Sequence, residues 1–145
     1  MGQVVYTGGT FDLFHSAHVR FLKACRRLAG DDGEVVVALN SDAFIEAYKG
    51  KSPVMTFDER KEVLLGCRYV DRVIANIGGA DSKPSIELVM PDLIVVGDDW
   101  AKKDYYAQMQ FTREWLDQLE IQLVYVPYTL GISTTDLKKR ILSVR

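Results

Sequence analysis

The stretch from residue 3 to residue 29, QVVYTGGTFDLFHSAHVRFLKACRRLA, decides the fold class. Its first four residues, QVVY, form a short run of the kind that is typical of a buried strand. Gly8 and Gly9 then mark a turn, and from about His18 onward apolar residues recur at three- and four-residue spacing, which predicts a helix. A strand, a glycine turn and a helix in this order form the first half of a βαβ unit.

The same alternation continues to the end of the chain. Continuous runs of Val, Ile and Leu are typical of parallel strands that are covered on both faces. They predict further strands at residues 34–39, 72–75, 93–96 and 121–126, and helices near residues 60–68, 84–90, 105–119 and from 134 onward. The sequence therefore predicts an α/β fold: a doubly wound, Rossmann-like open parallel sheet of about five strands with helices on both faces.

The last predicted helix begins with a capping signal. Ser133 precedes it and Asp136 lies three residues later, which is the spacing of an N-terminal cap. Within the helix Leu137, Ile141 and Leu142 share one face. We therefore expect these three side chains to face the core.

Composition limits the class of protein. The chain has 145 residues, 48% of them hydrophobic and 26% charged, which fits one domain spanning residues 1–145. The 18 Lys and Arg against 20 Asp and Glu lack the basic excess of a nucleic-acid binder, so we expect no nucleic-acid partner. With neither a signal peptide nor a run of 18 apolar residues, we expect a cytoplasmic protein without a membrane partner. Cys25 and Cys67 have no Cys or His cluster around them and are expected to be reduced thiols.

The glycine turn after the first strand is a candidate site, because ligands of open α/β sheets bind at the carboxyl ends of the strands. Gly8 and Gly9 let the backbone approach an anion, and His15 and His18, one helical turn apart, direct two donors at the same place. This pattern predicts a phosphate cradle. The alternatives are a tight turn with surface histidines and a zinc site with Asp12 as the third ligand.

Three further polar segments follow predicted strands or lie near them. Residues 131–136, GISTTD, offer hydroxyl and free N–H groups that bind phosphate or simply cap a helix. Residues 96–100, VGDDW, pair two carboxylates that suit Mg²⁺ or a ribose hydroxyl, beside a Trp that stacks on a ligand or packs in the protein. Residues 48–53, YKGKSP, carry two ammonium groups in a polar loop, either solvated or directed at a phosphate.

Together these segments carry a resemblance. GTFDLFHSAH, CRYVD, VVGDDW and GISTTDLKKRI occur in this order over nearly the whole chain, which resembles the cytidylyltransferase family of nucleotidyltransferases. The resemblance implies a dimeric enzyme that joins CTP to a small phosphorylated alcohol, glycerol 3-phosphate first among them, and releases pyrophosphate. It implies Mg²⁺ bound with the triphosphate and no dedicated metal site on the protein. The attacking phosphate oxygen is already ionised, so catalysis needs alignment and charge neutralisation and no general base.

The resemblance also assigns roles to individual residues. It implies that the reacting phosphates are contacted by His15, His18, Lys49 or Lys51, and Arg68. It implies that the nucleotide is held by Gly8, Gly9, Thr10, Phe11, Asp12, Asp98, Tyr128, Ser133, Thr134 and Thr135, with Asp12 orienting or capping its loop. It implies that the second substrate is held by Arg60, Arg68, Asp99 and Trp100.

The sequence departs from the family pattern in two places. Ala17 replaces a glycine between the histidines, which is tolerable if φ at this residue is negative. Tyr128 and Leu130 replace an Arg and a Glu, so the choice between cytosine and adenine stays open, and Tyr128 is a candidate to stack on the base. Phosphoethanolamine, phosphocholine and, with ATP, a sugar phosphate are alternative acceptors. A catalytically inactive, nucleotide-binding regulatory module is the alternative from another class.

Overall fold

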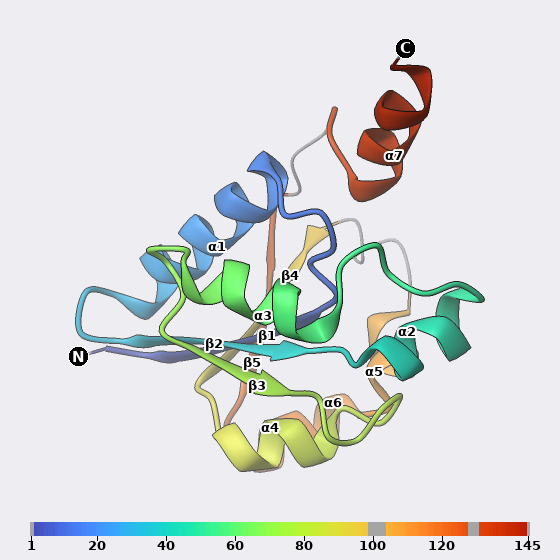
Figure 1. Ribbon diagram of the computed structural model, residues 1–145. Coiled ribbons are helices and arrows are strands. Elements are labelled where there is room, and N and C mark those ends of the chain that lie inside the picture. The colour runs from blue at the N-terminus through green and yellow to red at the C-terminus, as the bar shows by residue number, and fades with distance from the viewer. Residues whose placement is uncertain (1, 99–103, 128–130, 145) are drawn as a thin grey trace.

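The fold is a five-stranded parallel sheet between two layers of helices. A computed structural model describes residues 2–98, 104–127 and 131–144 (Figure 1). Within these ranges the strands are β1 (Val4–Gly9), β2 (Glu34–Leu39), β3 (Arg72–Ala75), β4 (Leu93–Gly97) and β5 (Gln122–Val126). All pairs are parallel and the strand order is β3-β2-β1-β4-β5, so the predicted doubly wound, Rossmann-like fold is confirmed.

The first strand is longer than its sequence pattern predicts. It continues through the two glycines, because Gly8 pairs with Ala38 and Gly9 with Leu39 of the neighbouring strand. Pairing with β2 outweighs the usual reading of a glycine pair as a turn. The glycines are therefore the last residues of β1, at the carboxyl edge of the sheet.

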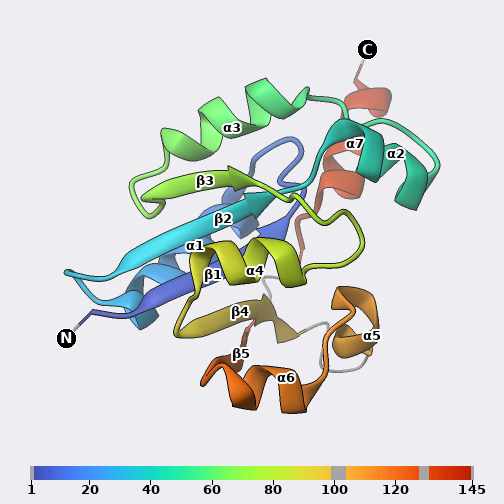
Figure 2. The ribbon, with the colours of Figure 1, turned by 90° about the horizontal axis from the view of Figure 1, so that it is seen from below.

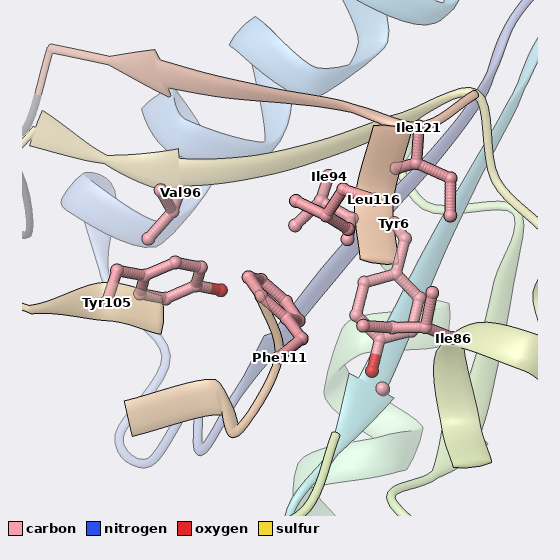
Figure 3. Close-up of a cluster of buried hydrophobic side chains, with 9 residues drawn as sticks. Tyr6, Ile86, Ile94, Val96, Tyr105, Phe111, Leu116 and Ile121 are labelled. Carbon is pink, nitrogen blue, oxygen red and sulfur yellow. The ribbon is translucent and has the colours of Figure 1, made fainter. Parts of the chain in front are cut away.

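Helices cover the two faces of the sheet separately (Figures 1 and 2). Figure 1 shows α1 (Ser16–Ala29) and α3 (Phe57–Leu65) above the sheet, and α4 (Lys83–Val89) and α6 (Arg113–Gln118) below it. The alternation of β1 explains this division, since Val5 packs with Cys25 and Ala29 of α1 whereas Tyr6 faces the opposite layer. Figure 3 shows the lower core, which is formed by Tyr6, Ile86, Ile94, Val96, Tyr105, Phe111, Leu116 and Ile121.

The helix predicted at residues 105–119 is in fact two helices. They are α5 (Tyr105–Met109) and α6, separated by Gln110, whose φ of 59° is left-handed. After this break Phe111 is 4% exposed and packs against Tyr105 and Trp115, while the Thr112 hydroxyl accepts the Trp115 N–H and starts α6. Burial of Phe111 therefore outweighs the helical periodicity of the segment.

One helix was not expected from the sequence. α2 (Asp42–Lys49) runs into the segment predicted to be a polar loop. The Ser41 hydroxyl caps it by accepting the Phe44 N–H, and it ends at Gly50, which has a φ of 76°. Ile45 is its one buried residue, so its apolar signal is weak. Lys49 thus stands on the last turn of a helix.

The prediction that the last helix turns Ile141 and Leu142 inward is wrong. α7 (Thr134–Ser143) buries none of its ten described residues, and Ile141 and Leu142 are 60% and 85% exposed. Leu137 is half-buried. In Figure 1, α7 lies apart from both helix layers, and its amino-terminal turn touches the loop after β1 through a hydrogen bond from Thr134 to Asp12. The apolar residues Ile141 and Leu142 of α7 therefore do not pack against the core of the described chain.

This exposure has a measurable consequence. Leu142→Asp should change the free energy of unfolding by less than about 0.5 kcal/mol, because the side chain loses no buried contact. Ile94→Ala, at a fully buried position of β4, should cost about 2–5 kcal/mol. Urea unfolding of both variants gives the comparison. If Leu142→Asp costs as much as Ile94→Ala, then α7 packs inward as its sequence pattern predicts.

The cysteines and the lengths of the helices were also considered from the sequence, and the structure describes both. Cys25 is buried and Cys67 is half-buried, and both are free thiols, as predicted. Across the part of the chain that the structure describes, no helix combines the length and the apolar character that a bilayer crossing requires.

Candidate active site

A cavity of about 380 Å³ opens at the carboxyl edge of the sheet. The chain passes from β1 outward to β3 and then crosses to β4 on the other side of β1, so the topological switch point lies between β1 and β4. The cavity lies at this point, because the ends of both strands line it. Its walls include these residues that the sequence singled out: Gly8, Gly9, Thr10, Phe11, Asp12, His18, Lys49, Lys51, Thr134 and Thr135.

The loop after β1 is held in an unusual backbone conformation. Phe11 and Leu13 have φ values of 52° and 48°, in the left-handed region that residues with a side chain rarely adopt. The Phe11 ring is buried among Leu22 and its neighbours, which keeps the loop folded back. A Cβ on Gly9 would lie 2.8 Å from this ring, so glycine is needed there. Strain of this kind typically marks functional sites.

The two histidines form the amino-terminal cap of α1. His15 Nδ1 accepts the Ala17 N–H at 3.2 Å, and His18 Nδ1 accepts the His15 N–H at 3.2 Å. The rings stack, with their centroids 3.8 Å apart. Because each Nδ1 accepts a backbone hydrogen, the proton of each neutral imidazole is on Nε2, which is then a donor. His18 lines the cavity, with His15 stacked on it.

Both imidazoles are neutral. Burial lowers the pKa of His18 to about 3, with a further lowering from the positive charge that His15 would carry and an opposing effect from Asp12. Burial also lowers the pKa of His15. The pair therefore presents uncharged N–H donors at neutral pH, and the cationic charge of the site comes from other residues.

The protonation state of His18 can be tested directly. We expect its ring to remain neutral, with the proton on Nε2, from about pH 8 down to about pH 5 in the free protein. Long-range ¹H–¹⁵N correlation spectra across this range report both the tautomer and any titration. A His18 ring that titrates at or above its ordinary pKa of about 6.5 would contradict this account.

The same pKa shift predicts how stability depends on pH. His18 has a lower pKa in the folded state than in the unfolded state, so between about pH 6.5 and about pH 3 the unfolded chain binds more protons. Unfolding free energy should therefore fall as the pH falls through this window. His18→Gln should flatten the fall relative to the unaltered chain, as measured by urea unfolding at each pH.

Three lysines make the cavity electropositive. Lys49 and Lys51 both line it, and Lys138 of α7 joins them. Burial is the largest cause that lowers the pKa of Lys49. The positive charges of Lys138, Lys51 and Arg60 lower this pKa further, and the negative charge of Asp12 raises it. Among the described lining residues Asp12 is the one acid. Lys138 was missed from the sequence, although its position four residues after Thr134 puts it on the same helix face.

The amino-terminal turn of α7 forms another wall. Thr134 donates from its hydroxyl to the Asp12 carbonyl at 2.7 Å, and Thr135 also lines the cavity. The Ser133 hydroxyl accepts the Asp136 N–H at 3.0 Å, so it caps the helix. The early N–H groups of the helix and its dipole favour an anion here.

Two of the predicted arginines, Arg60 and Arg68, do not line the cavity. Arg60 is fully buried, and its guanidinium donates to the carbonyls of Met55 and Thr10 and to Asp42, so it holds backbone rather than facing a substrate. Arg68 is exposed in the turn before β3, with its guanidinium over the Tyr69 ring. That turn lies at the amino edge of the sheet, opposite the cavity, because parallel strands all begin there.

The other predicted residues are placed as follows. Asp98 is exposed and comes directly after Gly97, which lines the cavity. Asp99, Trp100, Tyr128 and Leu130 lie outside the described residues.

Ala17 fits the site despite departing from the family pattern. It is 3% exposed, lines the cavity and lies inside helix α1, where φ is negative. The condition for tolerating a methyl group at this position, a negative φ, is therefore met.

The zinc site that the sequence left as an alternative would need ligand atoms from the histidine pair and Asp12. Both Nδ1 atoms of the histidine pair accept backbone hydrogens, and the Asp12 oxygens accept those of Val54 and Met55. Within residues 2–98, 104–127 and 131–144, no three His, Cys, Asp or Glu side chains gather as a metal-ligand group.

Comparison with known proteins agrees with this geometry. Residues 6–140 match the family model described as cytidylyltransferase-like. The chain is 38% identical over 137 residues to a glycerol-3-phosphate cytidylyltransferase of Bacillus subtilis, covering 94% of this chain and 95% of the relative. It is 30% identical over 145 residues to an FAD synthase of Korarchaeum cryptofilum, covering 99% and 95%.

A solved structure shares the fold. The lipopolysaccharide core biosynthesis protein from Thermoplasma volcanium superposes with a TM-score of 0.68 and 29% identity, covering 90% of this chain and 100% of that one. The family match spans the strand ends, the histidine pair and the lysines that surround the cavity. This chain belongs to the cytidylyltransferase-like family and is a nucleotidyltransferase.

Proposed function

We propose that this chain transfers the cytidylyl group of CTP to a phosphorylated alcohol, with glycerol 3-phosphate as the leading acceptor, and releases pyrophosphate. One observation carries the proposal. Uncharged imidazole donors, glycine-loop backbone, three lysines and a helix amino terminus converge on one cavity at the switch point of the sheet. This combination suits a triphosphate, which is polyanionic and offers many acceptor oxygens.

The reaction follows from these groups. An oxygen of the acceptor phosphate attacks the α-phosphorus of CTP, a new P–O bond forms, and the bond to the bridging oxygen breaks as pyrophosphate leaves. His18 donates from Nε2 to the reacting phosphate, and His15 supports its ring by stacking. Lys49, Lys51 and Lys138 neutralise charge on the departing pyrophosphate. Mg²⁺ bound with the nucleotide would supply further positive charge to the phosphates, and no residue of this chain is assigned to hold it.

A second candidate is adenylyl transfer from ATP to FMN, which would yield FAD. It is favoured by the FAD synthase relative, whose similarity extends over nearly the whole of both chains. FMN is itself a phosphorylated alcohol, so the same phosphate chemistry applies. The choice between the candidates depends on how the base is recognised, and the sequence has Tyr128 and Leu130 where the family pattern has an Arg and a Glu.

The test is pyrophosphate release with Mg²⁺ across a grid of substrates. CTP, ATP, GTP and UTP are each paired with glycerol 3-phosphate, phosphoethanolamine, phosphocholine, FMN and sugar phosphates. Release with CTP and glycerol 3-phosphate supports the proposal, and release with ATP and FMN supports the second candidate. Nucleotide binding without release from any pair would instead favour a regulatory module.

We also propose that the protein is a homodimer, as the family resemblance implies. Light scattering of the purified protein should give twice the mass of the chain. A monomer mass at assay concentration, with activity retained, would overturn this part of the proposal.

A further inference from the structure

The backbone of Met55 is held on both sides by buried charged side chains. Asp12 accepts the Met55 N–H at 2.9 Å through Oδ1 and the Val54 N–H at 2.8 Å through Oδ2. Arg60 donates from Nε to the Met55 carbonyl at 3.1 Å. Asp12 is 5% exposed and Arg60 is fully buried, so both side chains are shielded from water.

The same two side chains reach the loop after β1. Asp12 belongs to that loop, and Arg60 donates from Nη1 to the Thr10 carbonyl at 2.8 Å. Arg60 also pairs with Asp42 at 2.6 Å, at the start of α2. Asp42 in turn accepts the Phe57 N–H at the start of α3, so both ends of the segment between α2 and α3 are tied to one network.

Apolar packing does little to hold this segment. Residues 50–56 are exposed or half-buried throughout, and the Val54 side chain is 59% exposed. Even so, Lys51, Ser52 and Pro53 form one wall of the cavity. The Ser52 hydroxyl donates to Glu46 of α2 at 3.2 Å, in an exposed contact. The shielded contacts that fix this wall are therefore the hydrogen bonds of Asp12 and Arg60.

We infer that Asp12 and Arg60 are positioning residues, which clasp the Met55 backbone and thereby hold the lysine-bearing segment 50–56 against the loop after β1. The inference rests on the proposed function, in which the cavity takes the triphosphate. Neither side chain needs to touch substrate. When the clasp opens, Lys51 and its neighbours leave the cavity wall, and the triphosphate binds more weakly while His18 still acts on what is bound.

The test compares Asp12→Asn and Arg60→Lys with the matched controls Asp31→Asn and Arg27→Lys, which alter exposed residues away from the cavity. The Asn amide turns a donor toward one of the two backbone N–H groups, and Lys lacks the fork that spans Met55, Thr10 and Asp42. Amide exchange at Val54 and Met55 should rise about tenfold or more, while exchange in β2 and β4 stays unchanged. Trypsin should also cleave faster after Lys51.

Kinetics supply the second readout. The KM for CTP should rise about tenfold or more in both clasp variants, with kcat within about threefold of the unaltered chain, and both controls should match the unaltered chain. If Arg60→Lys does not fold, Asp12→Asn carries the test alone. Exchange unchanged at Val54 and Met55, exchange raised equally in β4, or a loosened segment with unchanged KM would each overturn the inference.

The two proposals fail in different ways. If the unaltered chain neither binds CTP nor releases pyrophosphate, the proposed function fails. Binding of inorganic tripolyphosphate then replaces KM as the readout. Faster amide exchange confined to segment 50–56, together with weaker tripolyphosphate binding, supports the clasp. Any other combination of the exchange and binding results overturns it.

Discussion

His18→Ala is expected to lower kcat by about 10²- to 10³-fold, the loss that follows removal of one preorganised donor from a reacting oxyanion. His18 lines the cavity, and its Nε2 is the free donor because Nδ1 accepts the His15 N–H. Loss of that backbone hydrogen bond should cost about 1 kcal/mol of stability, too little to unfold a domain. Steady-state kinetics and urea unfolding of the same preparation separate the two effects.

His18→Gln is the matched variant for this prediction. Its amide places an uncharged donor near the position of Nε2, so it should recover part of the lost kcat, whereas a required positive charge would leave it as inactive as alanine. An unchanged kcat in His18→Ala, or a loss of activity no larger than the loss of folded protein, would make His18 a structural residue.

Lys138→Gln is expected to raise the KM for CTP by about 10- to 100-fold, which corresponds to about 1.5–3 kcal/mol for a hydrogen bond to a charged group. Lys138 lines the cavity beside Lys49 and contributes to the lowered pKa of that neighbour. Its removal should therefore also raise the pKa of Lys49 toward the ordinary value. The pKa change is measurable by the pH dependence of lysine modification.

Lys139→Gln is the control for Lys138→Gln, because it is the next residue on α7 and is exposed. It removes the same charge from the same helix, so it should leave the KM for CTP within about twofold if local contact rather than overall charge matters. Equal effects of the two substitutions would contradict the proposed lysine contact. The difference should shrink with added salt, which screens the phosphate interaction.

The fold class followed from sequence because its signal is repeated along the chain. Five apolar runs separated by helical patterns allow few other arrangements, and the predicted bounds at residues 34–39 and 72–75 coincide with β2 and β3. The errors occur where tertiary structure departs from local periodicity, through an added contact or a missing one. Burial of Phe111 breaks the predicted helix at Gln110, and Ile141 is exposed although its helical spacing is that of a core face.

The candidate site was predicted in part for a similar reason. Gly9 ends a strand, His18 and Thr135 lie in the first turns of helices, and the fold gathers such positions at one edge. Lys138 lies one turn inside α7 and belongs to no motif that assigns it a role. Its place in the site follows only from the structure, in which it lines the cavity. Arg60 does not line the cavity, and sequence alone does not tell a buried arginine that binds backbone carbonyls from one that faces a ligand.

Isotope transfer tests the central claim most directly. The unaltered chain is incubated with Mg²⁺, glycerol 3-phosphate and CTP labelled with ³²P at either the α- or the γ-phosphate, and His18→Ala serves as the control for contaminating activity. We predict that the α-label appears in a new CDP-alcohol and the γ-label in pyrophosphate, both strongly reduced in His18→Ala. Release of the γ-label as inorganic phosphate, or transfer of equal rate in His18→Ala, would contradict nucleotidyl transfer at this cavity.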